Sequence, residues 1–161
     1  MRALRLRLIG GFEVFDADGA PVALSSKKAA ALLAYVAVQG RRPSSRDKLA
    51  GLLWGDSAEP QARSSLRQAL SVLRRMLPEQ VLHTDAHSVA VDPAALDVDV
   101  LELEALLDAG DAESAARAVA LYDGDLLDGF HPRASGFEDW LLAERARLRE
   151  RVSAALATLL E

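Results

Sequence analysis

The segment PQARSSLRQALSVLRRML, residues 60–77, carries two side-chain patterns that belong on two faces of one helix. Its leucines recur at steps of four, three and four residues, which is helical spacing. We therefore expect a helix over residues 61–77 that buries this stripe and is stopped by Pro78. The expected buried residues are Leu66, Ala69, Leu70, Leu73 and Leu77.

The other face of this helix carries only arginine, glutamine and serine, because no acidic residue occurs from Gln61 to Leu77. Exposed helix faces ordinarily mix acids and bases in i,i+4 pairs. Arginine can pair with guanine and glutamine with adenine in the major groove, and serine reaches phosphates. We interpret the face as a DNA-reading surface; the alternative is a plainly solvated face. The candidate DNA-binding residues are Arg63, Ser64, Arg67, Gln68, Ser71, Arg74 and Arg75.

Two more helices are expected before this one. A mostly apolar helix should run over residues 26–39 and stop at Gly40, because glycine favours the position that follows a helix. The next should be capped by Ser44 or Ser45 and end at Gly55. With the helix at 61–77, these segments have the order of a helix-turn-helix.

Basic residues gather near the start of the second helix. In a helix-turn-helix, the first helix of the pair crosses the DNA backbone. Arg46 and Lys48 are therefore candidate phosphate contacts, although a plain surface charge explains each of them equally well.

Short strands flank the three helices. Alternating leucines at 4–8 and the apolar residues of 12–15 predict two strands of a small antiparallel sheet, with a short third strand at 21–24. Two short apolar runs at 81–82 and 88–91 predict a hairpin. Strands, three helices and a hairpin, in that order, predict an α+β winged helix-turn-helix with an N-terminal antiparallel sheet.

The remainder of the chain has a different character. It predicts two antiparallel amphipathic helices joined at Ala109–Gly110 and one long helix from Phe137 onward. Residues 1–98 carry 13 Lys and Arg against 10 Asp and Glu, a net charge of +3. Residues 99–161 carry 6 against 14, a net charge of −8. This asymmetry indicates two modules with different partners.

Several functional classes are disfavoured. The chain has no cysteine, which excludes disulfides and cysteine-ligated zinc and fits a reducing compartment. Its histidines, at 83, 87 and 131, are too dispersed for a metal site, and motifs of nucleotide-binding proteins and hydrolases are missing. No apolar run approaches the ~18 residues that span a bilayer. We expect a cytoplasmic protein that is not an enzyme and needs no cofactor, metal or membrane.

The sequence also resembles the Streptomyces antibiotic regulatory protein (SARP) family over nearly its whole length. The most specific similarities are LAGLLWGD at 49–56, SSLRQALSVLRR at 64–75 and FEDWLLAERARLRE at 137–150. The first two are similar to an OmpR/PhoB-type winged helix, and the third to the bacterial transcriptional activator domain that follows it. The expected division is a DNA-binding domain at 1–95 and a partial activator domain at 96–161.

This resemblance implies a sequence-specific transcriptional activator. Residues 61–77 would be the recognition helix and 81–91 the wing. The second module would be all-α and tetratricopeptide-like, and would mediate dimer or domain contacts. Members bind direct repeats in promoters as side-by-side protomers and contact RNA polymerase and its sigma factor, so double-stranded DNA and the polymerase are the implied partners.

The chain departs from the family pattern at identifiable positions. Many members have basic residues where this chain has Ala30 and Val72; the wing commonly has a turn glycine near Ala86 or His87 and a basic residue at Ala90. The activator module is short, so leucines of the last helix lack a neighbour to pack against. Either the chain is a fragment of a longer protein, or its last helix packs across a homodimer.

Two other functions stay open at this point. The winged helix could be a docking fold in a protein-interaction module, with the acidic helical half as the contact surface. Alternatively, the chain could be the N-terminal effector domain of a larger signalling ATPase.

Overall fold

The N-terminal sheet contains strands from both ends of the winged-helix region. The computed structural model describes residues 2–161. Strand β1 (Leu4–Arg7) pairs antiparallel with β2 (Glu13–Asp16), as predicted, and parallel with β6 (Leu96–Val98) on its other edge. The prediction of a third strand at 21–24 is wrong: that segment makes a single bridge to β2 at its first residue. The third strand of the sheet is instead β6, which comes from the far end of the winged-helix region.

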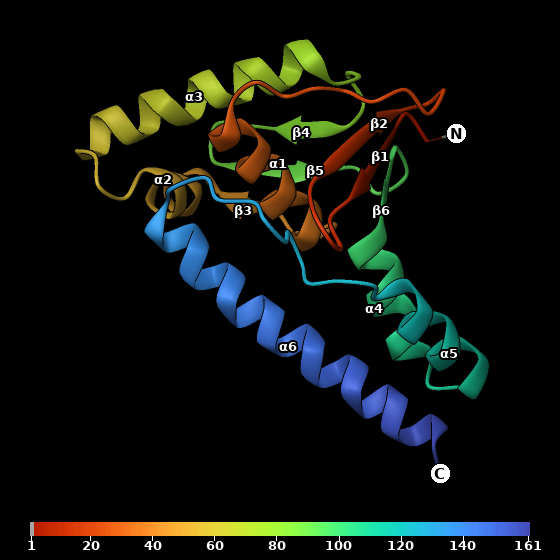
Figure 1. The fold of residues 1–161 in the computed structure, drawn as a ribbon. Coiled ribbons are helices and arrows are strands. Elements are labelled where there is room, and N and C mark those ends of the chain that lie inside the picture. The colour runs from red at the N-terminus through yellow and green to blue at the C-terminus, as the bar shows by residue number, and fades with distance from the viewer. Residues whose placement is uncertain (1) are drawn as a thin grey trace.

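Three helices and a second sheet complete the winged helix-turn-helix (Figure 1). They are α1 (Lys27–Gln39), α2 (Arg46–Trp54) and α3 (Glu59–Met76). The second sheet has the order β3-β5-β4, and its strands are β3 (Ser44–Ser45), β4 (Leu82–Thr84) and β5 (Ser88–Val91). The fold class expected from the sequence is confirmed, and the predicted hairpin is β4–β5.

Local capping explains where the helices begin and end. The Ser26 hydroxyl accepts a hydrogen bond from the Ala29 N–H at 3.1 Å, and the Ser45 hydroxyl accepts one from the Lys48 N–H at 3.1 Å. Such caps satisfy backbone donors that a helix leaves free at its start. Helix α1 ends at Gly40, whose φ of +63° is unfavourable for other residues. Its residues 29–38 are buried throughout, so α1 forms the centre of the core.

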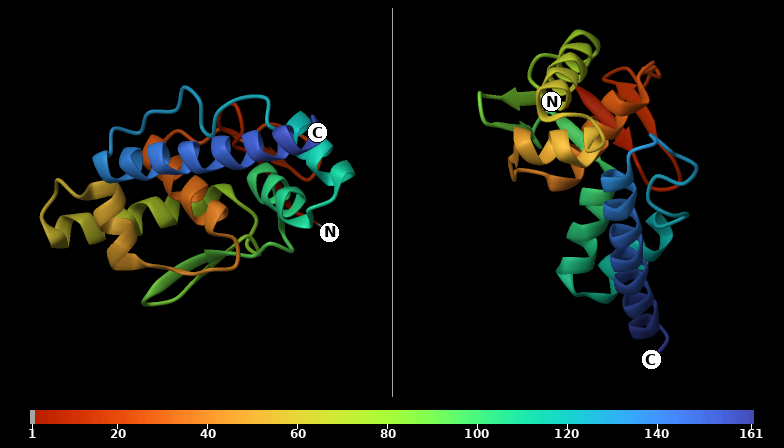
Figure 2. Two further views of the ribbon diagram at one scale, coloured as in Figure 1. Left: turned by 90° about the horizontal axis from the view of Figure 1, so that it is seen from below. Right: turned by 90° about the vertical axis from the view of Figure 1, so that its left-hand side faces the viewer.

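The second module consists of α4 (Asp99–Ala109), α5 (Ala112–Leu121) and α6 (Ser135–Leu159). Helices α4 and α5 form a hairpin that packs against the C-terminal half of α6, while the start of α6 packs on α2 (Figures 1 and 2). The helical character expected of this half is confirmed from Asp99 onward, whereas residues 96–98, which were assigned to the all-α module, form strand β6. The likeness of the module to a tetratricopeptide repeat stays a prediction. No helix within residues 2–161 is long and apolar enough to span a bilayer.

The two modules are joined by backbone hydrogen bonds at the end of β1. The N–H groups of Leu8 and Ile9 both donate to the Asp99 carboxylate, each at 2.9 Å. The Gly10 N–H donates to the Asp125 carbonyl at 2.8 Å. Since buried backbone groups need such partners, the helical half completes the hydrogen bonding of the N-terminal sheet. The domain division at residue 95 stays a prediction.

Candidate nucleic-acid interface

Helix α3 is held by its leucine stripe. Leu66, Leu70 and Leu73 are at most 1% exposed, and Leu77 just beyond the helix is also buried, as predicted. This burial fixes the rotation of the helix about its axis, so its polar face points away from the body. In Figure 1, α3 lies along the top of the molecule, at the opposite side from α5 and the end of α6.

The structure brings six of the seven predicted α3 residues together on that outer face. They border a single shallow, open hollow along the helix, with Val72 among them. The lining residues are Ser64, Arg67, Gln68, Ser71, Val72, Arg74 and Arg75. All but Ser64 and Val72 are exposed, and those two are half-buried.

Arg63, the seventh residue, is paired within its own helix. Helix α3 begins at Glu59, two residues before the predicted start, and the Glu59 carboxylate accepts a hydrogen bond from the Arg63 guanidinium. The polar face is therefore free of acid only beyond its first turn. Exposed i,i+4 pairs of this kind are weak, so Arg63 remains accessible at the margin of the surface.

The long side chains of this face other than Arg74 lack protein partners. Among the residues that the structure describes, Arg67, Gln68 and Arg75 make no side-chain hydrogen bond or ion pair. An exposed guanidinium carries five donors, which water satisfies in the free protein. These groups can therefore bind a ligand without breaking an internal contact.

Two other predicted residues are tied to the β4–β5 hairpin. The Arg74 guanidinium donates a hydrogen bond to the Thr84 hydroxyl, and Arg46 Nε donates to the Asp85 carbonyl at 2.8 Å. Lys48 is exposed on α2. The Thr84 contact was not predicted, because it joins residues ten positions apart on different elements and no sequence period reports it.

The tip of the hairpin is acidic. The Asp85 carboxylate accepts hydrogen bonds from the His87 and Ser88 N–H groups, each at 2.7 Å. These bonds, that of His87 foremost, lower the pKa of the Asp85 carboxyl below its ordinary value. Neither His83 nor His87 belongs to a metal-binding group: within residues 2–161, no three or more suitable side chains converge on one point.

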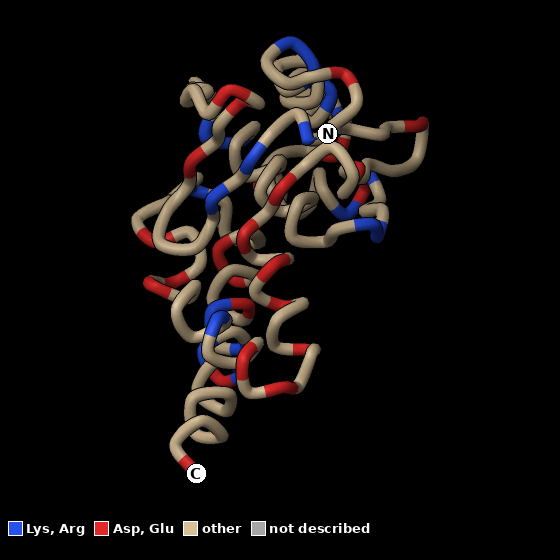
Figure 3. The backbone as a smooth tube through the Cα atoms, turned by 90° about the vertical axis from the view of Figure 1, so that its right-hand side faces the viewer, with Lys and Arg blue, Asp and Glu red and all other residues tan. Residues whose placement is uncertain are grey.

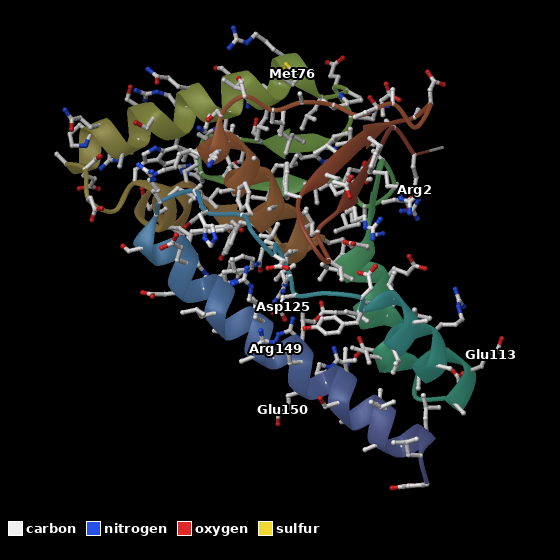
Figure 4. All side chains as sticks on the ribbon, in the orientation of Figure 1. Arg2, Met76, Glu113, Asp125, Arg149 and Glu150 are labelled. Carbon is white, nitrogen blue, oxygen red and sulfur yellow. The ribbon has the colours of Figure 1, made fainter. Side chains whose placement is uncertain are left out.

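The arginines of α6, in contrast, are bonded within the protein. Arg147 pairs with Glu104 at 2.6 Å, and Arg151 pairs with Asp108 at 2.6 Å. Arg149 lies beside Asp125, as Figure 4 shows. Acidic positions predominate around α4 and α5, in the lower part of Figure 3. None of these acids pairs with an α3 arginine in the part of the chain that the structure describes, so the α3 face is not masked by the acidic half.

The chain thus has the fold of a winged helix-turn-helix followed by a helical module that packs on it. The same fold occurs in Mycobacterium tuberculosis EmbR, solved in complex with a low-affinity phosphopeptide. The two are 24% identical in sequence and superpose with a TM-score of 0.72 over 99% of this chain and 45% of the EmbR chain. This chain therefore spans less than half of EmbR, and the similarity establishes the fold. No protein-family model and no curated protein matches the sequence.

Proposed function

We propose that this protein binds double-stranded DNA in a sequence-specific manner through α3 and regulates transcription. The observation that carries the proposal is the set of unpaired side chains, Arg67, Gln68 and Arg75, on the outer face of a helix whose other face is locked into the core. Helix-turn-helix proteins insert such a helix into the major groove. The SARP-like pattern of the sequence supports the same function.

Each part of the surface has a role under this proposal. Arg67 and Gln68 read base edges, because their side chains can form paired hydrogen bonds with guanine and adenine. Ser71, and Arg46 and Lys48 on α2, contact phosphates and fix the register. The protein acts in the cytoplasm and needs no metal or cofactor for this binding.

The helical module supplies protein contacts under the same proposal. It is tetratricopeptide-like, and its acidic surface contacts RNA polymerase or its sigma factor, which makes the protein an activator.

A second copy of the chain packs on α6, where Leu142 is 64% exposed and Leu156, two heptads further on, is 43% exposed. Sedimentation of wild type against Leu142→Glu tests it; identical monomeric profiles would contradict it.

Selection of bound duplexes from a random pool tests the DNA assignment. A direct-repeat motif is expected, and affinity for the selected duplex should fall steeply with salt, because bound phosphates release counterions. A flat salt response and no enriched sequence would contradict DNA binding. That outcome would favour a docking fold, either in a protein-interaction module or in the N-terminal part of a signalling ATPase.

A further inference from the structure

The β4–β5 hairpin is poorly suited to contact DNA directly. No lysine or arginine occurs from residue 76 to residue 98, whereas Glu79, Asp85, Asp92 and Asp97 lie in that range. Asp85 stands at the exposed tip, where a wing would approach the phosphate backbone. A carboxylate there is repelled by phosphate, and the hydrogen bonds that hold it ionised keep that repulsion in place.

The hairpin nevertheless contacts both helices of the helix-turn-helix. On one side, the Thr84 hydroxyl accepts a hydrogen bond from the guanidinium of Arg74, in the last turns of α3. On the other, the Asp85 carbonyl accepts one from Arg46 Nε at 2.8 Å, and the His87 carbonyl accepts one from the Arg46 N–H at 2.9 Å. Both arginines belong to the candidate DNA-binding surface.

The geometry of the turn makes these acceptors rigid. The Asp85 carboxylate closes the turn by accepting two successive backbone N–H groups, which is a stable local arrangement for aspartate. Strand β5 is paired on both edges, with β3 and with β4. The carbonyl of Asp85 and the hydroxyl of Thr84 are therefore fixed before any ligand arrives.

We propose that the hairpin is a positioning element for Arg74 and Arg46 and does not itself contact DNA, an inference that rests on the proposed function of α3. Thr84 and the turn at Asp85 each occupy one donor of an arginine, and the remaining guanidinium donors have no partner among the described residues. Fixing a long side chain in advance lowers the entropy lost on binding. Thr84 is the positioning residue whose loss tests the idea.

Thr84→Val removes the hydroxyl and keeps the shape and the strand preference of the side chain. We expect affinity for the selected duplex to fall about 3- to 10-fold, as for one lost hydrogen bond, with unchanged affinity for random duplex. Thr84→Ser, the matched control, should bind like wild type. Adding Thr84→Val to Arg74→Ala should cause no further loss, because the two residues act together.

A measurement without DNA separates this inference from the function on which it rests. NMR of the Arg74 side-chain nitrogens in the free protein measures how fast its guanidinium rotates. Rotation should be slow in wild type and in Thr84→Ser, and fast in Thr84→Val. If rotation is the same in all three proteins, the positioning role is wrong even where DNA binds. If rotation changes as expected but no duplex binds wild type, the proposed function is wrong and the contact stands.

Whether the hairpin contacts DNA is tested separately. His87→Ala at the tip should leave affinity and salt dependence unchanged, and hydroxyl-radical footprints should show no protection in the minor groove beside the selected site. Protection there, together with weaker binding by His87→Ala, would overturn the proposal and make the hairpin a DNA-contacting wing.

Discussion

Gly136 and Leu52 lie in direct backbone contact between α6 and α2. A β-carbon at Gly136 would come within 2.9 Å of the Leu52 carbonyl oxygen, closer than such atoms approach in folded proteins. The first turn of α6 therefore packs directly on α2, the helix that precedes α3. Phe137 is fully buried beside it, and Trp140 packs edge-on against Tyr35 of α1 with ring centroids 4.8 Å apart.

Gly136→Ala should weaken this contact. The added methyl group meets backbone that cannot move aside cheaply, and overpacking of this kind costs about 1–3 kcal/mol. Urea denaturation followed by circular dichroism measures the change. Gly51→Ala on α2 is the matched control, because a methyl group at Gly51 would have no neighbouring atom within 4 Å. That substitution should be neutral or stabilising by up to about 1 kcal/mol. Equal effects of the two substitutions would show that the contact is not tight.

Asp99→Ala should destabilise the junction between the modules. The substitution leaves the Leu8 and Ile9 N–H groups without their acceptor, and an unsatisfied buried donor costs about 1–3 kcal/mol. Asp97→Ala removes an exposed ion pair with Arg2, so it should change stability by less than about 1 kcal/mol. Thermal unfolding of both variants measures the difference, and a loss no larger for Asp99→Ala than for Asp97→Ala would contradict this role.

Arg67→Ala should impair DNA recognition without affecting the fold. Arg67 is exposed, and it makes no side-chain hydrogen bond or ion pair within the described chain. We expect specific binding to weaken by about 1–3 kcal/mol and preference to relax at one base pair. Fluorescence anisotropy with the selected duplex measures the effect. Arg117→Ala, which removes an exposed arginine of α5, should bind like wild type; equal affinities for all three proteins would refute the role of Arg67.

Acid should weaken the contact between the α5–α6 loop and α6. Arg149 foremost, and also Tyr122, lowers the pKa of the Asp125 carboxyl below its ordinary value of 3.8. A lowered folded-state pKa contributes stability that is present above the ordinary value and lost as pH falls through the folded-state value. The stability difference between wild type and Asp125→Asn should therefore be greatest above pH 3.8 and shrink below it.

A second buried carboxyl group, that of Asp99, does not disturb the pH experiment. Burial raises the pKa of Asp99, which gives the opposite dependence: its ionisation disfavours the fold as pH rises. Since Asp99 is present in both proteins, its contribution cancels in the difference. A difference between wild type and Asp125→Asn that stays constant from neutral pH to well below 3.8 would contradict the assignment to Asp125.

Local signals in the sequence predicted most of the winged helix. The alternation of Leu4 and Leu6 identified β1, serine caps and Gly40 bounded α1, and the leucine steps of residues 66–77 fixed both the existence and the orientation of α3. Each of these signals arises within one element, from its own periodicity or its own ends. The exposed face of α3 could then be predicted as well, because burial of the leucine stripe leaves the opposite side of the helix in solvent.

Contacts between distant segments were not predicted. Strand β6 is three residues long, which is too short for a recognisable alternation, and it pairs with a strand near the start of the chain. Neither its length nor the residues next to it therefore predict it. Asp99 looks like an ordinary acid at a helix start, and its role depends on where Leu8 lies in space. The same is true of Thr84 and Arg74. Such contacts depend on how the chain folds back on itself, and the periodicity of a single sequence does not reveal that.

The hydrogen bonds that residues 8–10 donate to Asp99 and Asp125 have a mechanical consequence. Because these bonds hold residues 8–10 at both Asp99 and Asp125, they oppose an independent movement of the α4–α6 assembly. Helix α6 reaches from α2 to α5 over roughly 37 Å, at 1.5 Å per residue. A force applied at the far end of α6 would therefore reach α2, and under the proposed function a displacement there would change how α2 and α3 contact DNA.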